Sequence, residues 1–133
     1  MNHNIIEKSN QNEIGSVKIS DDVVKVITGL AATEITGVAG MSAGLVGGIA
    51  EMLGKKNMAK GVKVEVGEKD AKVDLYIIVE YNARIPDVAL RVQENVKKSI
   101  ETMTGLNVTE VNIHIQGIGF VSEVKVKEDD THN

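Results

Sequence analysis

The stretches Val73–Tyr81 (VDLYIIVEY) and Pro86–Met103 (PDVALRVQENVKKSIETM) decide the fold of this chain. The first alternates apolar and polar side chains, a period of two that predicts a β-strand with one buried face. In the second, apolar residues recur at helical spacing, which predicts an amphipathic helix opened by its proline. The expected buried stripe of this helix consists of Val88, Val92, Val96, Ile100 and Met103.

The same order of strand, helix and closing triplet occurs twice in the chain. The first copy runs from Ile14 through Asp21–Ile35 to Thr36-Gly37-Val38, and the second ends at Thr104-Gly105-Leu106. Glycine is a common helix stop, because it adopts the left-handed conformation at little steric cost. Neither copy carries an obvious catalytic group, so we expect a compact scaffold whose function lies on its surface.

Three further strands are predicted. Ile14–Ile19 precedes Ser20, which is a good N-cap for the first helix. Val62–Val66 pairs with Val73–Tyr81 through a hairpin loop at 67–70, and Val108–Ile118 follows the second helix. The first helix is expected to bury the apolar residues of one helical face, namely Val23, Val24, Ile27, Leu30, Ala31 and Ile35.

The predicted element order, β-α-(α)-β-β-α-β, indicates an α+β fold with the helices packed on one face of a mixed or antiparallel sheet. We expect a single domain over residues 14–121, because single domains commonly contain about 100–150 residues. Residues 1–13 and 122–133 are rich in polar side chains. We expect both to be disordered tails, since they carry too little apolar surface to offset the entropy of ordering.

Residues 37–61 contain seven glycines and are expected to form a mobile helix or loop. Apolar residues within this segment still share one helical stripe, which predicts a short helix at about 42–53. The segment is a candidate for contact with a membrane or a partner, because lysines follow the stripe. The residues concerned are Met41, Leu45, Ile49, Met52, Leu53, Lys55 and Lys56.

The composition excludes several classes of site. The chain has no cysteine, and therefore no disulfide, thiolate nucleophile or Cys-ligated metal. Aromatic residues make up 2% and the net charge is −4, so neither base stacking nor a basic surface favours nucleic acid. The start of the chain lacks the apolar region of a signal peptide, and no apolar run approaches the roughly 20 residues of a membrane span. We expect a cytoplasmic protein without cofactor or metal.

The outward face of the sheet is the predicted partner-binding surface. Its strands carry apolar side chains among mixed charges, a combination suited to a weak, specific contact. The candidate residues are Lys72, Asp74, Tyr76, Ile78, Glu80, Asn112 and His114. An enzyme would have to use His114 as a base, oriented by Glu110 or Asp74. No nucleophile motif or phosphate loop accompanies it, so we expect no catalytic site.

Residues in both halves of the chain match a known family. The matching residues are Val73-Asp74-Leu75, Tyr81, Arg84-Ile85-Pro86, Val88-Ala89, Val92–Lys97, Ile100–Leu106 and Val111-Asn112-Ile113, together with Gly15–Ile19, Ala31–Glu34 and Gly37-Val38. With these residues, the chain from Gly15 to Phe120 resembles the alkaline shock protein family of Gram-positive bacteria. The match is most specific in the second half.

The resemblance implies a non-enzymatic cytoplasmic scaffold of the cell-envelope stress response. Members of this family resemble peripheral envelope proteins that small membrane-anchored partners recruit to the inner side of the membrane, and they are prone to self-association. The resemblance therefore implies a protein partner, peripheral membrane association and a homo-oligomer. It supplies no catalytic residue.

Two alternatives remain open from the residues. A KH-like nucleic-acid-binding module clamps a sugar-phosphate backbone with a GxxG loop between two helices. Gly37-Val38-Ala39-Gly40 and Gly44-Leu45-Val46-Gly47 match that pattern, but neither has a basic residue between its glycines. The second alternative is weak direct lipid contact through the 41–53 stripe, with Lys55 and Lys56 near anionic head groups.

Overall fold

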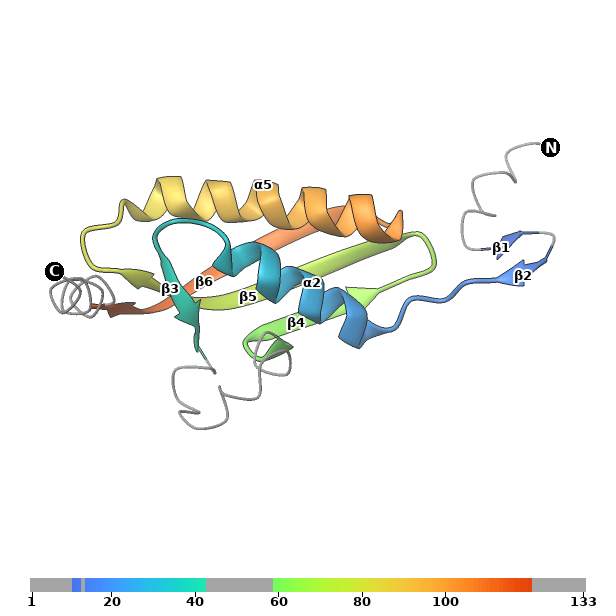
Figure 1. Ribbon diagram of the computed structural model, residues 1–133, viewed down its shortest axis with the longest axis horizontal. Helices are drawn as coiled ribbons and strands as arrows, with labels where there is room; N and C mark the ends of the chain where they lie inside the picture. Colours follow the sequence, from blue (N-terminus) through green and yellow to red (C-terminus); the bar gives the residue numbers. More distant parts are fainter. Residues whose placement is uncertain (1–10, 13, 43–58, 121–133) are drawn as a thin grey trace, which may run out of the picture.

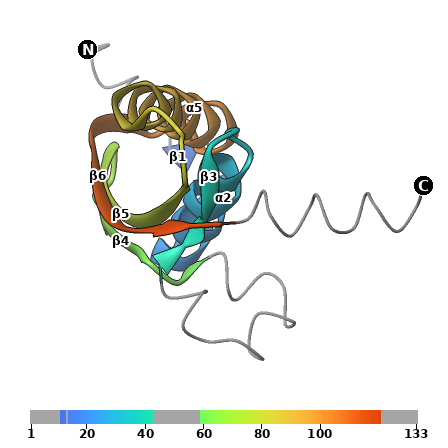
Figure 2. The ribbon, with the colours of Figure 1, turned by 90° about the vertical axis from the view of Figure 1, so that its left-hand side faces the viewer.

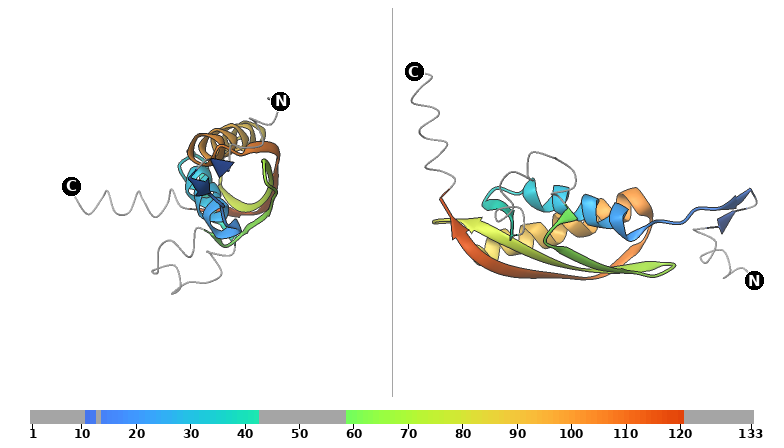
Figure 3. Two further views of the ribbon diagram at one scale, coloured as in Figure 1. Left: turned by 90° about the vertical axis from the view of Figure 1, so that its right-hand side faces the viewer. Right: turned by 90° about the horizontal axis from the view of Figure 1, so that it is seen from below.

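The computed structural model describes residues 11–12, 14–42 and 59–120 (Figure 1). These residues form two helices and a mixed sheet, and the predicted α+β fold is confirmed. The helices are α2 (Asp21–Thr33) and α5 (Ile85–Thr104), and the strands are β1 (Gln11–Asn12), β2 (Gly15–Ser16), β3 (Val38–Met41), β4 (Val62–Val66), β5 (Asp70–Glu80) and β6 (Asn107–Gly119). Both helices lie on the concave side of a curved sheet (Figures 2 and 3). Within the described ranges, no helix is long and apolar enough to cross a membrane.

β5 is the central strand of the main sheet. β6 runs parallel to it along one edge, while β4 and β3 pair antiparallel with successive parts of the other edge. β4 pairs with 71–75 and β3 with 77–79. The parallel pair follows from α5, because a helix that crosses over the sheet brings the next strand back in the same direction. The sheet is therefore mixed, one of the two arrangements that the sequence allows.

The core lies between the helices and the concave face of the sheet. α5 buries four of its five predicted stripe residues: Val88, Val92, Val96 and Ile100. Alternate residues of β5 face them and are fully buried: Val73, Leu75, Ile77 and Val79. Burying an aliphatic side chain of this size contributes roughly 1.5–3 kcal/mol. The strand and helix that decide the fold therefore pack directly against each other.

α2 begins where the sequence predicts and ends earlier. The Val23 N–H donates a hydrogen bond to the Ser20 hydroxyl at 3.3 Å, so Ser20 caps the helix. The last helical residue is Thr33, and Gly37 is therefore not the helix stop. Gly37 lies in the turn into β3 with φ +105°, where a Cβ would be 2.6 Å from Val88 Cγ2. This position requires glycine for its conformation and for the close approach of α5.

The predicted strand Ile14–Ile19 is wrong for most of its length. Only Gly15–Ser16 is a strand, and it pairs with Gln11–Asn12 in a hairpin away from the main sheet (Figure 1). Ile14 is 97% exposed. The alternating pattern does not lead to a longer strand here, because no described strand of the main sheet lies beside residues 14–19 to pair with them. The two copies of the sequence pattern consequently differ: the first leads into an antiparallel strand, β3, and the second into a parallel one, β6.

The glycine-rich segment begins with a strand instead of a helix or loop. Val38–Met41 forms β3, and Met41 is 4% exposed, so this residue belongs to the core. The physical reason is that β4 covers only the first part of the β5 edge, and β3 supplies hydrogen-bonding partners for the next part. The other stripe residues and lysines lie outside the described residues, where their helix stays a prediction: Leu45, Ile49, Met52, Leu53, Lys55 and Lys56.

Three side chains that the stripes predict to be buried are exposed. Val23 is 45%, Leu30 is 43% and Met103 is 70% exposed. They lie at the edges of the two apolar stripes, beyond the arc of each helix that the sheet covers. Periodicity identifies the apolar residues of a helix, but it does not show which of them the sheet covers.

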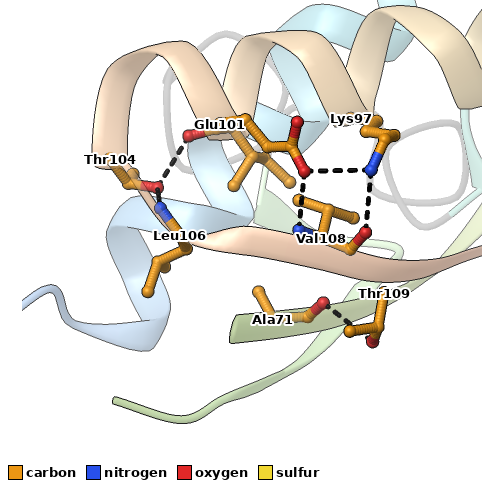
Figure 4. A network of polar contacts seen from close by, with 8 residues as sticks. Ala71, Lys97, Glu101, Thr104, Leu106, Val108 and Thr109 are labelled. Carbon is orange, nitrogen blue, oxygen red and sulfur yellow. Dashed lines mark hydrogen bonds and ion pairs between the residues drawn. The ribbon is translucent and has the colours of Figure 1, made fainter. Parts of the chain in front are cut away.

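Polar side chains of α5 hold the first part of β6 (Figure 4). The Val108 N–H donates to Glu101 Oε2 at 2.9 Å, and Lys97 Nζ donates to the Val108 carbonyl at 3.0 Å. Gln93 Nε2 donates to the Val111 carbonyl at 3.0 Å. The hydrogen bond from Val108 and the pairing with Lys97 at 2.9 Å lower the pKa of Glu101 below its ordinary value. One helix face therefore fixes the position of the strand that carries His114.

Candidate functional site

The outward, convex face of the sheet carries rows of polar and aromatic side chains. The rows run across β4, β5 and β6, because residues that are register partners lie side by side. They consist of Glu65, Lys72 and Glu110; of Lys63, Asp74 and Asn112; and of Tyr76 with His114. We call these eight residues the polar grid. The grid brings together five residues of the predicted contact surface: Lys72, Asp74, Tyr76, Asn112 and His114.

Opposite charges meet within the grid. Lys72 stands between Glu65 and Glu110 in its row, with its Nζ 3.9 Å from Glu110 Oε1. Asn112 Nδ2 donates to the same glutamate oxygen at 3.1 Å. Exposed ion pairs contribute only about 0–1 kcal/mol to stability. These contacts therefore arrange the side chains of the surface more than they stabilise the fold.

An aromatic stack forms the third row. The ring centres of Tyr76 and His114 are 4.4 Å apart, and the planes differ by 9°. Lys63 Nζ lies 5.4 Å from the centre of the Tyr76 ring, where the negative π-face attracts a cation. His114 Nε2 is 3.5 Å from Asp74 Oδ1, so Asp74 is one of the two carboxylates considered from the sequence that lies beside the histidine.

This arrangement limits the chemistry open to His114. Its Nε2 is buried and makes no hydrogen bond within the described part of the chain. A general base must come within about 2.6–3.2 Å of the proton that it removes. A covered nitrogen does not offer that approach to a substrate. The contacts that the histidine makes are the stack with Tyr76 and the approach to Asp74.

Two residues of the predicted contact surface lie apart from the grid. Ile78 is only 9% exposed, which contradicts its predicted place on the exposed face. The reason is local: Ile77, Ile78 and Val79 are buried in succession, so both faces of β5 are covered at this end. Glu80 lines a separate hollow of about 410 Å³ beside the start of α5, together with Arg84.

Three grid residues are missing from the sequence-based contact set: Lys63, Glu65 and Glu110. Alternation alone places all three on the outward face. The hairpin loop at 67–70 also sets the register of β4 against β5, which brings Lys63 beside Asp74. Counting outward from that loop would have found two of the three residues. Glu110 becomes a neighbour of Lys72 only through the parallel pairing of β6.

The first GxxG match is not a loop between helices. Val38–Met41 is a strand in which Val38 is buried and Gly40 is paired with Ile78. A KH-type clamp requires the GxxG backbone to be open to a sugar-phosphate chain. The KH-like alternative therefore loses this match. Its other match, Gly44-Leu45-Val46-Gly47, lies outside the described residues.

Relatives of this chain are found along most of its length. The model of the alkaline shock protein 23 (ASP23) family, described as having a cell envelope-related function, matches residues 9–120. The uncharacterized protein YqhY of Bacillus subtilis (strain 168) is 41% identical over 119 residues, which are 87% of this chain and 88% of YqhY. A stress response regulator gls24 homolog of Streptococcus pyogenes serotype M3 is 32% identical over 115 residues, which are 86% of this chain and 61% of that protein.

A solved structure of similar shape is a MamM-CTD variant. It aligns with 74% of this chain and 98% of its own, at a TM-score of 0.46 and 13% identity. A likeness at that level supports no functional inference. The match to the family model, in contrast, confirms the resemblance that the sequence predicts.

Proposed function

Because the chain belongs to the ASP23 family, we propose that it is a non-enzymatic scaffold of the cell-envelope stress response, recruited from the cytoplasm to the inner face of the membrane through a protein partner. The family description and the name of the gls24 relative support a cell-envelope stress-related role. Scaffolding, recruitment and self-assembly are the finer parts that we add to this role.

The polar grid is the observation that carries the proposal. It combines a stacked pair, Tyr76 and His114, with a surrounding set of mixed charges. Weak but specific interfaces combine aromatic anchors with a polar rim in this way. Seven of the eight grid side chains, all but Glu65, already have a contact within the grid in the free protein, so binding orders fewer of them and costs less entropy.

The charges of the grid favour a protein over bare lipid. Three carboxylates, those of Glu65, Asp74 and Glu110, stand against the two ammonium groups of Lys63 and Lys72. Anionic head groups attract clusters of lysine and arginine, and this surface has a small excess of negative charge instead. A small membrane-anchored protein with a polar contact surface is the partner that we propose.

β6 is the strand that we propose for contact between copies. Among the described strands it pairs only with β5. α5 side chains bind backbone groups of Val108 and Val111. The following stretch, 112–119, contains no lysine or proline, the residues that commonly block pairing at a sheet edge. A second copy could therefore add a strand there.

A pull-down tests the proposed recruitment. The tagged full chain is captured from gently solubilised cells of its source, and a small membrane-anchored protein is expected to be recovered with it. Lys72→Ala and His114→Ala should reduce this recovery, because both remove grid side chains. Lys98→Ala is the matched control, since Lys98 is exposed on α5 and outside the grid. Circular dichroism establishes that each variant is folded.

The pull-down distinguishes failure of the polar grid as the contact surface from failure of the proposed recruitment. Equal recovery by the grid variants and the control would contradict the grid as the contact surface. Recovery of no membrane protein by the folded wild type would contradict recruitment itself. Oligonucleotide binding is measured on the same sample, and RNA that stays bound at moderate salt would favour a KH-like module instead.

A further inference from the structure

A groove of about 510 Å³ lies between α2 and α5. Ile27 and Ala31 are buried at its base, and the exposed side chains of Val23, Leu30 and Met103 also line it. The lining surface is almost entirely apolar. It belongs to the helical layer, whereas the polar grid belongs to the convex face of the sheet.

The three exposed side chains are those that the apolar stripes predict to be buried. Val23 and Leu30 are on α2 and Met103 is on α5, so both helices contribute exposed apolar surface to the groove. Scattered exposed apolar residues are ordinary, but a contiguous apolar groove marks an interaction site. Aliphatic walls between two helices suit the apolar face of a third helix.

The charge of the groove narrows the choice of occupant. Asp22 and Glu34 are its charged lining residues, and both are acidic. They lie near opposite ends of α2, about 18 Å apart at 1.5 Å per residue. Asn95 Nδ2 donates a hydrogen bond to Glu34 Oε1 at 2.9 Å, which holds that carboxylate at the junction of the two helices. The groove is thus an apolar slot with an acidic rim.

We propose that this groove binds an amphipathic helix of a partner protein, with aliphatic residues at i, i+3, i+4 and i+7 and lysine or arginine flanking them. A second copy seated groove to groove would place acidic rim against acidic rim, because a two-fold contact uses the same patch on both subunits. Anionic lipid meets the same repulsion. The proposal goes beyond the scaffold function and uses a different surface, so either can fail alone.

Fluorescence anisotropy with a model peptide tests the groove. The probe is a fluorescein-labelled amphipathic peptide of leucine and lysine, about 14 residues long so that it spans the groove. The full-length wild type is expected to bind it. Leu30→Asn should weaken binding about tenfold, as removal of a central interface anchor does. Leu90→Asn is the matched control: Leu90 is a 54% exposed leucine on α5 outside the groove, and binding should stay unchanged.

The acidic rim is tested with a second matched pair. Asp22→Asn should weaken peptide binding and reduce its salt dependence, whereas Asp21→Asn should not, because Asp21 is in the same helical turn but does not line the groove. A peptide with glutamate in place of lysine should bind much more weakly. Equal binding of the two peptides would overturn the assignment of a basic partner.

Methyl chemical shifts locate the bound peptide. Perturbations are expected at Val23, Leu30 and Met103, and perturbations confined to the sheet face would overturn the proposal. So would equal loss of binding in both leucine variants, or failure of the folded wild type to bind. Sedimentation equilibrium tests for a second copy of the chain as the occupant, and binding to anionic vesicles tests for lipid. If no peptide binds and Leu30→Asn dissociates an oligomer that the wild type forms, the groove is assigned to a second copy. If no peptide binds and Leu30→Asn abolishes binding to vesicles, the groove is assigned to lipid.

Discussion

α5 and α2 carry similar apolar stripes, but the sheet covers them to different extents. Four of the five stripe residues of α5 are at most 3% exposed, whereas α2 leaves Val23 and Leu30 at 45% and 43%. α5 crosses over the sheet between two strands that pair in parallel, and it also binds β6 through polar side chains. α2 packs on the same layer and is bonded to the other helix, since Asn95 Nδ2 of α5 donates a hydrogen bond to the Ala31 carbonyl at 2.8 Å. Periodicity therefore predicts which side of a helix is apolar, whereas the packing of that helix on the sheet decides how much of the apolar side is buried.

The largest effect is expected for truncation in the covered stripe. Ile100→Ala should lower the free energy of unfolding by about 2–5 kcal/mol, because it leaves a cavity at a fully buried site. Urea denaturation measures this loss. Met103→Ala is the control three residues along the same helix, where a 70% exposed side chain should change the value by less than about 0.5 kcal/mol. Similar losses in both variants would mean that the whole α5 stripe is covered.

A smaller effect is expected at the helix ends, which differ between the two helices. The C-cap residue of α5 is Gly105 with φ +80°, while that of α2 is Glu34 in the right-handed helical region. Gly105→Ala should cost about 1–2 kcal/mol from the left-handed backbone alone, since a Cβ there would meet nothing within 4 Å. Gly105→Asn should cost less, because asparagine tolerates this conformation. Urea denaturation measures both variants, and a loss in Gly105→Asn as large as in Gly105→Ala would contradict the left-handed backbone as the cause.

The polar bonds from α5 to β6, which distinguish α5 from α2, should make the stability of the fold depend on pH. The folded state lowers the pKa of Glu101, mainly through the Val108 N–H and then through Lys97, so this residue stabilises the fold above its unfolded pKa. That contribution is lost as the pH falls through the lowered, folded pKa. Glu101→Gln should therefore reduce stability at neutral pH, and the difference from wild type should shrink in acid.

Two measurements check this prediction. Urea midpoints of the wild type and the variant are compared between neutral and acidic pH. The Val108 N–H donates its hydrogen bond to Glu101, so hydrogen exchange of this amide should be faster in the variant. Glu94→Gln is the control, because Glu94 is exposed on the same helix. A pH-independent difference would show that the Glu101 carboxylate is not the group that matters.

The sequence predicts the parts of the fold that have a long periodic pattern. α5, β4 and β5 are recognisable because each repeats its period several times and meets a clear turn signal. β3 is not, because its four residues lie in a glycine-rich run and become a strand only beside the uncovered edge of β5. The parallel pairing of β6 depends likewise on tertiary placement, which periodicity does not contain.

The candidate site is predictable to a similar degree. Alternation places Asp74 and His114 on the outward faces of their strands, but the parallel pairing of β6 is what brings the two side chains together. Alternation fails at Ile78, where β5 is covered on both faces. The place of Lys63 beside Asp74 depends on the hairpin register, and its position over the Tyr76 ring depends on side-chain conformations that the pattern does not contain. The exposure of Leu30 is the opposite case: the pattern indicates burial, and the monomer does not provide it.

The smallest expected effect is also the sharpest test of the difference between the helices. Leu30→Asn should change the free energy of unfolding by about 0.5 kcal/mol or less, because the side chain is already 43% exposed in the monomer. Ile27→Asn, one turn earlier on α2 but only 7% exposed, should be strongly destabilising, since it buries an amide among apolar groups. If Leu30→Asn were as costly as Ile27→Asn, the groove would be core and α2 would be covered as α5 is. A small cost would mean that Leu30 contributes little to the packing of the core, and that its apolar surface is available to another molecule.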